Sequence, residues 1–185
     1  MNWLVTAWLR RFGGTPCFRV YGKTHSEASW REIEVYATHR RDMDSRWPFL
    51  SGSCTTWSDC VVSVGWDFAE DLLREQIENP ASREHPVVVA GGRLRDLTLR
   101  LASGASSVAS ASEILAHEIG HTGQARRLGV AYLPLVGSVT LFREGPNWWN
   151  HFENDASESG QFGGIVPGSV CPRLQHLLKQ HRDGS

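Results

Sequence analysis

The stretch Ser110-Ala-Ser-Glu-Ile-Leu-Ala-His-Glu-Ile-Gly-His121 decides how the second half of this chain is organised. Ser110 and Glu113 have the spacing of a capping box, in which each side chain accepts from the free backbone N–H of the other residue at the start of a helix. Gly129 stands where the residue after the last helical turn is expected. The spacing therefore predicts a helix over residues 111–128.

This predicted helix carries the pattern H-E-x-x-H at His117, Glu118 and His121. Because the two histidines are four residues apart, their imidazoles lie one turn apart on one helix face and can reach the same metal ion. Glu118 lies beside that face, where it can accept a proton instead of binding the metal. The pattern predicts a zinc site; the alternative is a helix with two histidines that bind no metal.

A catalytic zinc site needs three protein ligands and one open position, so a third ligand must come from another segment. The extension H-E-x-x-H-x-x-G-x-x-H would require glycine at 124 and histidine at 127, but the chain has Gln124 and Arg127. A carboxylate from a second helix is the other option. The segment 152–157, Phe-Glu-Asn-Asp-Ala-Ser, is the natural place for it.

Residues 117–129, HEIGHTGQARRLG, and 150–157, NHFENDAS, resemble the gluzincins, zinc metallopeptidases with H-E-x-x-H followed later by E-x-x-x-D. The resemblance covers roughly the C-terminal half of the chain. It implies a zincin-like fold, Zn²⁺ as the cofactor and Glu118 as the general base. It also implies three metal ligands: His117, His121 and Glu153. His151 is an alternative third ligand.

The chain departs from the gluzincin pattern at one position. Where the family usually has aspartate four residues after the ligand glutamate, this chain has Ser157. That aspartate commonly orients a ligand histidine, and losses of this kind cost about 10–100-fold in metal affinity or activity. Asp155 and Glu158 are nearby carboxylates, but neither has the matching spacing. The departure favours an alternative, a catalytically weak or inactive zinc-binding module with a scaffold, regulatory or toxin-associated role.

The resemblance implies hydrolysis of a peptide or protein substrate. A metal-bound water would attack the peptide carbonyl while Glu118 takes its proton. A separate donor is usually needed for the developing oxyanion, and the sequence offers His151, Tyr132 and Arg143. Hydrolysis of a substrate other than a peptide and a metal-free α+β domain are the remaining alternatives.

Length and composition predict a single domain over residues 1–185. With a net charge of −1 the chain has no excess of positive charge to attract polyanions, so nucleic acid and anionic lipid are not expected partners. The first apolar run precedes Arg10 and Arg11, whereas a secretory signal has its positive charges before its apolar core. Neither this run nor segment 130–142 is long enough to span a bilayer. We expect a cytoplasmic protein in which 130–142 packs on the metal helix; contact with lipid or a partner is the alternative.

The four cysteines are expected to be reduced thiols, because no export signal accompanies them. A disulfide between Cys54 and Cys60 is the alternative to buried free thiols at those positions.

We expect an α+β fold, in which a small mixed or antiparallel sheet with one helix, formed before residue 110, packs on the helix that carries H-E-x-x-H. The part from 110 to 185 is expected to be mainly helix and loop. One further strand, 97–101, is predicted to follow a glycine turn at 91–92. The resemblance implies that this strand binds substrate along a sheet edge, and an interior strand is the alternative. The other predicted elements are strands at 17–21, 32–38 and 55–64, an amphipathic helix at 67–78 and a last short helix at 172–180.

Overall fold

The computed structural model describes residues 2–11, 13–38, 54–89, 110–132, 134–135 and 147–183. Its helices are α1 (Asn2–Arg11), α3 (Trp66–Glu78), α5 (Ala111–Leu128), α7 (Asn147–Ser159) and α8 (Gln175–Asp183), with a 3-10 turn η1 at Gly129–Ala131. Its strands are β1 (Thr15–Thr24), β2 (Arg31–Thr38), β3 (Cys54–Ser58), β4 (Val61–Gly65), β5 (Val87–Val88) and β6 (Gly160–Ile165).

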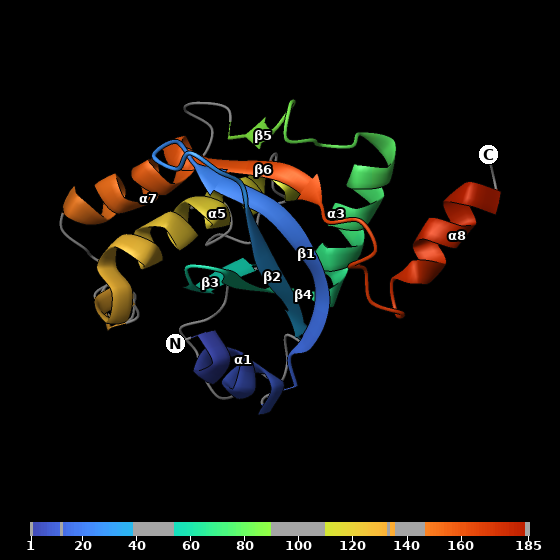
Figure 1. Cartoon of the computed structure of the whole chain (residues 1–185), viewed down its shortest axis with the longest axis horizontal. Helices are drawn as coiled ribbons and strands as arrows, with labels where there is room; N and C mark the ends of the chain where they lie inside the picture. Colours follow the sequence, from blue (N-terminus) through green and yellow to red (C-terminus); the bar gives the residue numbers. More distant parts are fainter. Residues whose placement is uncertain are drawn as a thin grey trace.

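The strands form one mixed sheet in the order β3-β4-β2-β1-β6-β5. Only β2 and β4 run parallel among these pairs, and the other neighbours are antiparallel. Figure 1 shows the helices around this sheet, with α5 and α7 side by side. The prediction of an α+β fold with a mixed sheet is confirmed, as are the helices at 111–128 and 67–78 within a residue at each end.

The sheet has an apolar layer on each face, because successive side chains of a strand point in opposite directions. On one face Val35 and Ala37 belong to the main core, which also contains α3, α5 and α8. On the other face Tyr36 packs with Leu9 of α1. The first helix therefore rests on the sheet.

Strand β6 is not among the elements that the sequence predicts, although the described part of 110–185 is otherwise mainly helical. Residues 160–165 lie inside the sheet, between β1 and β5. Segment 160–172 is rich in glycine and proline, which usually mark turns, so the sequence did not indicate a strand there. In β6 glycine permits close approach instead: a Cβ at Gly163 would lie 2.7 Å from the Trp30 ring.

Strand β5 is only two residues long and pairs with β6. The predicted strand at 97–101 and the glycine turn before it lie outside the described residues, as does most of segment 130–142. Among the helices that the structure describes, none has both the length and the apolar character needed to cross a bilayer.

A partly buried charge network fixes α5 against the sheet. Arg31 Nη2 of β2 donates to Thr122 Oγ1 of α5 and to Glu27 Oε2, at 3.1 Å in each case. Glu27 also accepts from Arg126 at the end of α5 at 3.0 Å. Burial raises the pKa of Glu27, but the backbone N–H of Thr24 and the Arg31 charge outweigh it and lower that pKa. The network therefore links α5 to β2 and to the turn after β1.

Candidate metal centre

Helix α5 begins with the predicted capping box. The backbone N–H of Glu113 donates to Ser110 Oγ at 3.1 Å, and the backbone N–H of Ser110 donates to Glu113 Oε2 at 3.1 Å. Gly129, with φ of +58°, follows the last helical residue. These local signals set the register of α5 and place His117 and His121 on its buried side, 8% and 7% exposed.

The structure brings both histidines together with Glu153 of α7. The Nε2 atoms of His117 and His121 are 3.1 Å apart, and Glu153 Oε2 lies 3.1 Å from the first and 3.4 Å from the second. These three side chains are positioned so that they could hold one metal ion.

The separations fit a small divalent cation. Ligand atoms placed about 2.0–2.2 Å from zinc in a tetrahedral arrangement lie roughly 3.3–3.6 Å from one another. The three observed separations, 3.1, 3.1 and 3.4 Å, are close to that range. Two imidazole nitrogens with one carboxylate oxygen are also a donor set found in catalytic zinc sites.

A hydroxyl orients His117. Ser157 Oγ lies 2.9 Å from Nδ1 of His117 and donates its own proton to the backbone carbonyl of Glu153 at 2.8 Å. Its oxygen therefore accepts from Nδ1–H of His117, which leaves the Nε2 lone pair directed at the centre of the site. Ser157, four residues after Glu153, thus gives His117 a neutral hydrogen-bond acceptor.

An amide orients His121. Gln124 Oε1 lies 2.8 Å from Nδ1 of His121. The amide nitrogen of Gln124 donates to the Phe152 carbonyl at 2.6 Å and to Asp155 Oδ2 at 2.9 Å, so its oxygen faces the histidine. Because that oxygen can only accept, His121 carries its proton on Nδ1 and directs Nε2 into the site.

The contact between Gln124 and His121 was not predicted from the sequence. In the sequence, Gln124 stands where the longer histidine motif requires glycine. Its spacing of three residues after His121 places it on the same helix face, which is the only signal that could have identified it. Asp155 does not contact His117 in place of Ser157; it accepts from Gln124 and pairs with Arg127 at 2.7 Å.

Helices α5 and α7 approach each other closely at glycine. A Cβ at Gly120 of α5 would lie 1.9 Å from the carbonyl oxygen of Ala156 in α7. At the end of α7, a Cβ at Gly160 would lie 1.9 Å from the carbonyl oxygen of Ala116. Since no other residue fits at these two contacts, glycine permits the close packing that brings Glu153 to the histidines.

Glu118 is hydrogen-bonded to the sheet and does not belong to the group of His117, His121 and Glu153. Thr56 Oγ1 of β3 lies 2.7 Å from Glu118 Oε2 and 2.9 Å from the backbone carbonyl of Glu118. The side chain is half-buried, whereas both histidines are buried. The carboxylate is thus positioned by the sheet, and no pattern in the sequence pointed to Thr56.

The charges of the three ligand residues depend on one another. Burial raises the pKa of Glu153, but hydrogen bonds with His117 and His121 outweigh burial and lower it to about 2. Burial lowers the pKa of His121, but the hydrogen bond to Glu153 and its negative charge raise it to about 9. At neutral pH the metal-free site therefore contains a carboxylate and a protonated imidazole.

Tyr132 is the predicted oxyanion donor whose side chain the structure describes. It is buried, and its ring stacks on Phe152 at 6.3 Å between centroids. Burial and the charges of Glu118 and Glu153 raise the pKa of Tyr132, so its hydroxyl stays protonated and can donate. The side chain of His151 and all of Arg143 lie outside the described residues.

Comparisons of this chain with protein-family models, curated proteins and solved structures found no match.

Proposed function

We propose that this protein is a zinc-dependent hydrolase that cleaves peptide bonds. The observation that supports this most is the convergence of His117, His121 and Glu153, with Nδ1 of both histidines engaged by other groups. When His121 gives up its Nε2 proton, that arrangement leaves three lone pairs directed at one point. A site used only to stabilise the fold would be closed by a fourth protein ligand, and the described residues contribute three to this group.

Zinc bound at this position would supply a Lewis acid that activates water and polarises a carbonyl. Glu118 would accept the proton of the attacking water and return it to the leaving amine. The Thr56 hydroxyl fixes the direction of that carboxylate, because it contacts both the carboxylate and the backbone of Glu118. Tyr132 would donate to the oxyanion, since its hydroxyl stays protonated near both carboxylates.

Two features favour a peptide as the substrate. Within the described part of the chain, β3 is the last strand at its end of the sheet, and it contacts α5 through Thr56. An extended peptide can add to a strand at a sheet edge through its backbone hydrogen bonds. A peptide placed along β3 would bring a backbone carbonyl towards the residue that we assign as the base.

A second candidate function is zinc binding without turnover. The observation that favours it is the neutral hydroxyl of Ser157 at His117, where the gluzincin pattern has a carboxylate. A carboxylate would raise the basicity of the ligand imidazole, and a hydroxyl does so less. In that case the three residues would hold the metal in a regulatory or scaffold protein.

The experiment compares zinc content and peptide cleavage in three proteins: the wild type, Glu118→Gln and His117→Ala. The wild type should bind one zinc and cleave a mixed peptide library in a reaction that a chelator blocks. Glu118→Gln should keep its zinc and lose turnover by about 10²–10⁴-fold. His117→Ala should lose both.

Zinc binding without cleavage in the wild type would support the second candidate. Cleavage that persists in Glu118→Gln would overturn the role of this residue. Wild-type protein that binds no zinc would overturn both functions.

A further inference from the structure

Two cysteines far apart in the sequence lie next to each other in the fold. Cys17 lies in β1 and is 1% exposed, whereas Cys171 follows β6 and is half-buried against the main core. The backbone N–H of Cys171 donates to the Cys17 carbonyl at 2.7 Å, so the two residues are direct neighbours across the fold. Both cysteines are free thiols in this structure.

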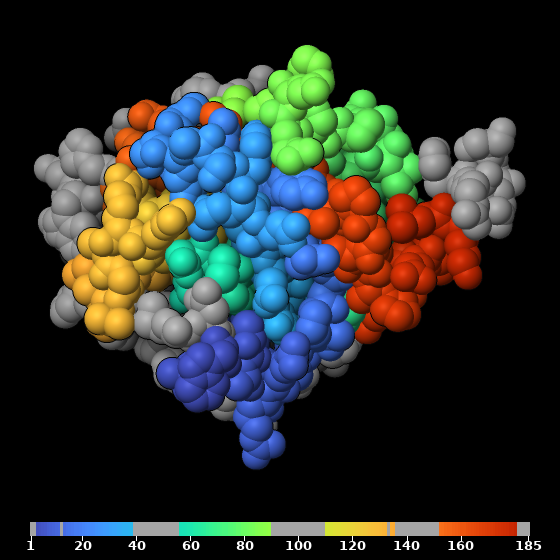
Figure 2. All heavy atoms as spheres, viewed as in Figure 1, coloured from blue at the N-terminus to red at the C-terminus, as the bar shows by residue number. Residues whose placement is uncertain are grey.

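The segment that carries Cys171 is fixed alongside β1. The backbone N–H of Val166 donates to the Arg19 carbonyl at 2.8 Å, and the backbone N–H of Arg19 donates to Ser169 Oγ at 3.0 Å. These bonds continue the pairing of β6 with β1 towards Cys17. Figure 2 shows the orange and red C-terminal residues against the blue strand.

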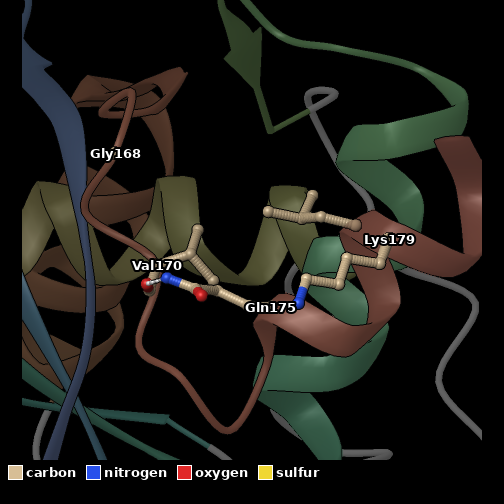
Figure 3. A pocket seen from close by; sticks show the side chains of 5 residues that line it. Gly168, Val170, Gln175 and Lys179 are labelled. Carbon is tan, nitrogen blue, oxygen red and sulfur yellow. Dashed lines mark hydrogen bonds between the residues drawn. The ribbon is translucent and has the colours of Figure 1, made fainter.

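The residues after Cys171 are also anchored. Leu174 is fully buried, and the guanidinium of Arg173 lies 3.9 Å from the centre of the Trp66 ring. Gln175 Nε2 donates to the Val170 carbonyl at 3.2 Å. Both residues line a pocket of about 220 Å³ between α8 and the segment before it (Figure 3). With contacts on both sides, Cys171 stays next to Cys17.

We propose that Cys17 and Cys171 form a disulfide within the native fold when a low-molecular-weight disulfide oxidises the protein. Disulfides join cysteines whose backbones are close neighbours, as these two are. This proposal is independent of the proposed hydrolase function.

The reaction consists of two thiol–disulfide exchanges. The Cys171 thiolate attacks one sulfur of the reagent, forms a mixed disulfide and releases the other half as a thiolate. The Cys17 thiolate then attacks the Cys171 sulfur, forms the protein disulfide and releases the second half. The protein loses two electrons and two protons, and the reagent gains both as two thiols.

The environments of the two thiols set this order. Cys171 is the more exposed of the two, so the reagent reaches it first. Burial and the neighbouring Cys171 thiol raise the pKa of Cys17, which makes it a poor first nucleophile. Cys17 then needs only to reach the sulfur of the residue whose backbone N–H it already accepts.

Cys60 cannot replace either member of the pair in the folded protein. It packs with the smaller apolar cluster under α1, on the opposite face of the sheet from Cys17. The disulfide would therefore not involve Cys60. It would tie the segment before α8 to β1 and close a loop that contains His117, His121 and Glu153.

Mass spectrometry tests the pairing. The folded full-length protein is treated with oxidised glutathione in the presence of a chelator, alkylated and digested with trypsin without reduction. The sequence places Cys17 in peptide 12–19 and Cys171 in peptide 144–173, and both other cysteines fall in peptide 47–74. We expect 12–19 linked to 144–173, and a reductant should separate them.

A glutathione adduct on 144–173 that never converts to the linked pair would overturn the proposal. So would oxidation confined to 47–74.

Three variants provide a second readout, the melting temperature with and without oxidised glutathione, again with chelator. Oxidation should raise the melting temperature of the wild type by about 5–10 °C, since the closed loop is long. Cys60→Ser should show the same rise, whereas Cys171→Ser and Cys17→Ala should show none. A rise that persists in Cys171→Ser, or one that disappears in Cys60→Ser, would contradict the pairing.

Discussion

Ser157 Oγ lies 2.9 Å from Nδ1 of His117 and donates to the carbonyl of Glu153 one helical turn earlier. One hydroxyl thus contacts His117 and the backbone of Glu153. Replacing Ser157 with alanine leaves Nδ1–H of a buried imidazole without an acceptor, which frees the ring to rotate and change tautomer. We expect zinc affinity to fall by about 10–100-fold in a competition assay with a chromophoric chelator.

The matched control for Ser157→Ala is Ser159→Ala in the same helix. The hydroxyl of Ser159 is buried and has no hydrogen-bond partner among the described residues. Its removal should leave zinc affinity unchanged. Equal losses in the two variants would show that the effect comes from the packing of α7 and not from His117.

Gln124 is expected to matter for zinc as much as Ser157 does. Gln124→Leu keeps a similar size but removes the acceptor for His121 and the donor to Asp155. Zinc affinity should fall by about 10–100-fold. Arg127→Ala is the control, because it disturbs Asp155 only at the surface. If Gln124→Leu binds zinc like the wild type, the amide does not fix the His121 ring.

Thr56 should affect turnover without affecting metal content. Thr56→Val has a similar shape but lacks the hydroxyl that contacts Glu118. Hydrogen bonds to charged groups contribute about 1.5–3 kcal/mol, so we expect peptide cleavage to fall by about 10–100-fold with stoichiometric zinc retained. Thr56→Ser keeps the hydroxyl and should restore most of the rate. A loss of zinc in Thr56→Val would instead assign this residue to the metal site.

The pKa values of the metal-free site predict that zinc uptake releases a proton. With a pKa of about 9, His121 is protonated at pH 7, and zinc can bind only the neutral ring. Binding at pH 7 should release about one proton, and binding above pH 9 should release progressively fewer. Calorimetry in two buffers with different ionisation enthalpies measures this number. A value near zero at pH 7 would contradict the charge state that we assign to His121.

The same values predict how pH affects the stability of the metal-free protein. His121 has a raised pKa, so its contribution is complete below about pH 6.5 and is lost as pH rises through about 9. Glu153 has a lowered pKa, so its contribution is complete above about pH 4.5 and is lost as pH falls through about 2. In chelator, the free energy of unfolding should therefore decrease from pH 6.5 to pH 9 by more in the wild type than in Glu153→Gln. An equal decrease would contradict this coupling.

The contact between α5 and α7 predicts a large effect of one methyl group. In Gly120→Ala the new Cβ would meet the carbonyl oxygen of Ala156 at 1.9 Å, so α7 must move away and take Glu153 with it. We expect a loss of about 1–3 kcal/mol or more in the free energy of unfolding and a strong loss of zinc. Gly65→Ala is the control, because a Cβ there meets nothing within 4 Å. Wild-type zinc affinity in Gly120→Ala would show that the helices do not need this close contact.

The sequence alone determined what depends on neighbours along the chain. The capping box at Ser110 and the glycine at 129 set the limits of α5, and the spacing of His117 and His121 set their common face. Alternation and helical periodicity likewise predicted β2 and α3. The position of Glu153 followed from the resemblance to the gluzincins, and the structure places its carboxylate at the two histidines.

Tertiary structure decided the contacts between distant segments. The partners of the metal site, Thr56 and Ser157, come from other elements than α5, and their roles depend on how β3 and α7 pack on that helix. Strand β6 exists because its backbone pairs with β1, although glycine-rich sequences are poor strands by local preference. Hydrogen bonds and close backbone approach of this kind depend on the packing of the whole chain, so no local pattern encodes them.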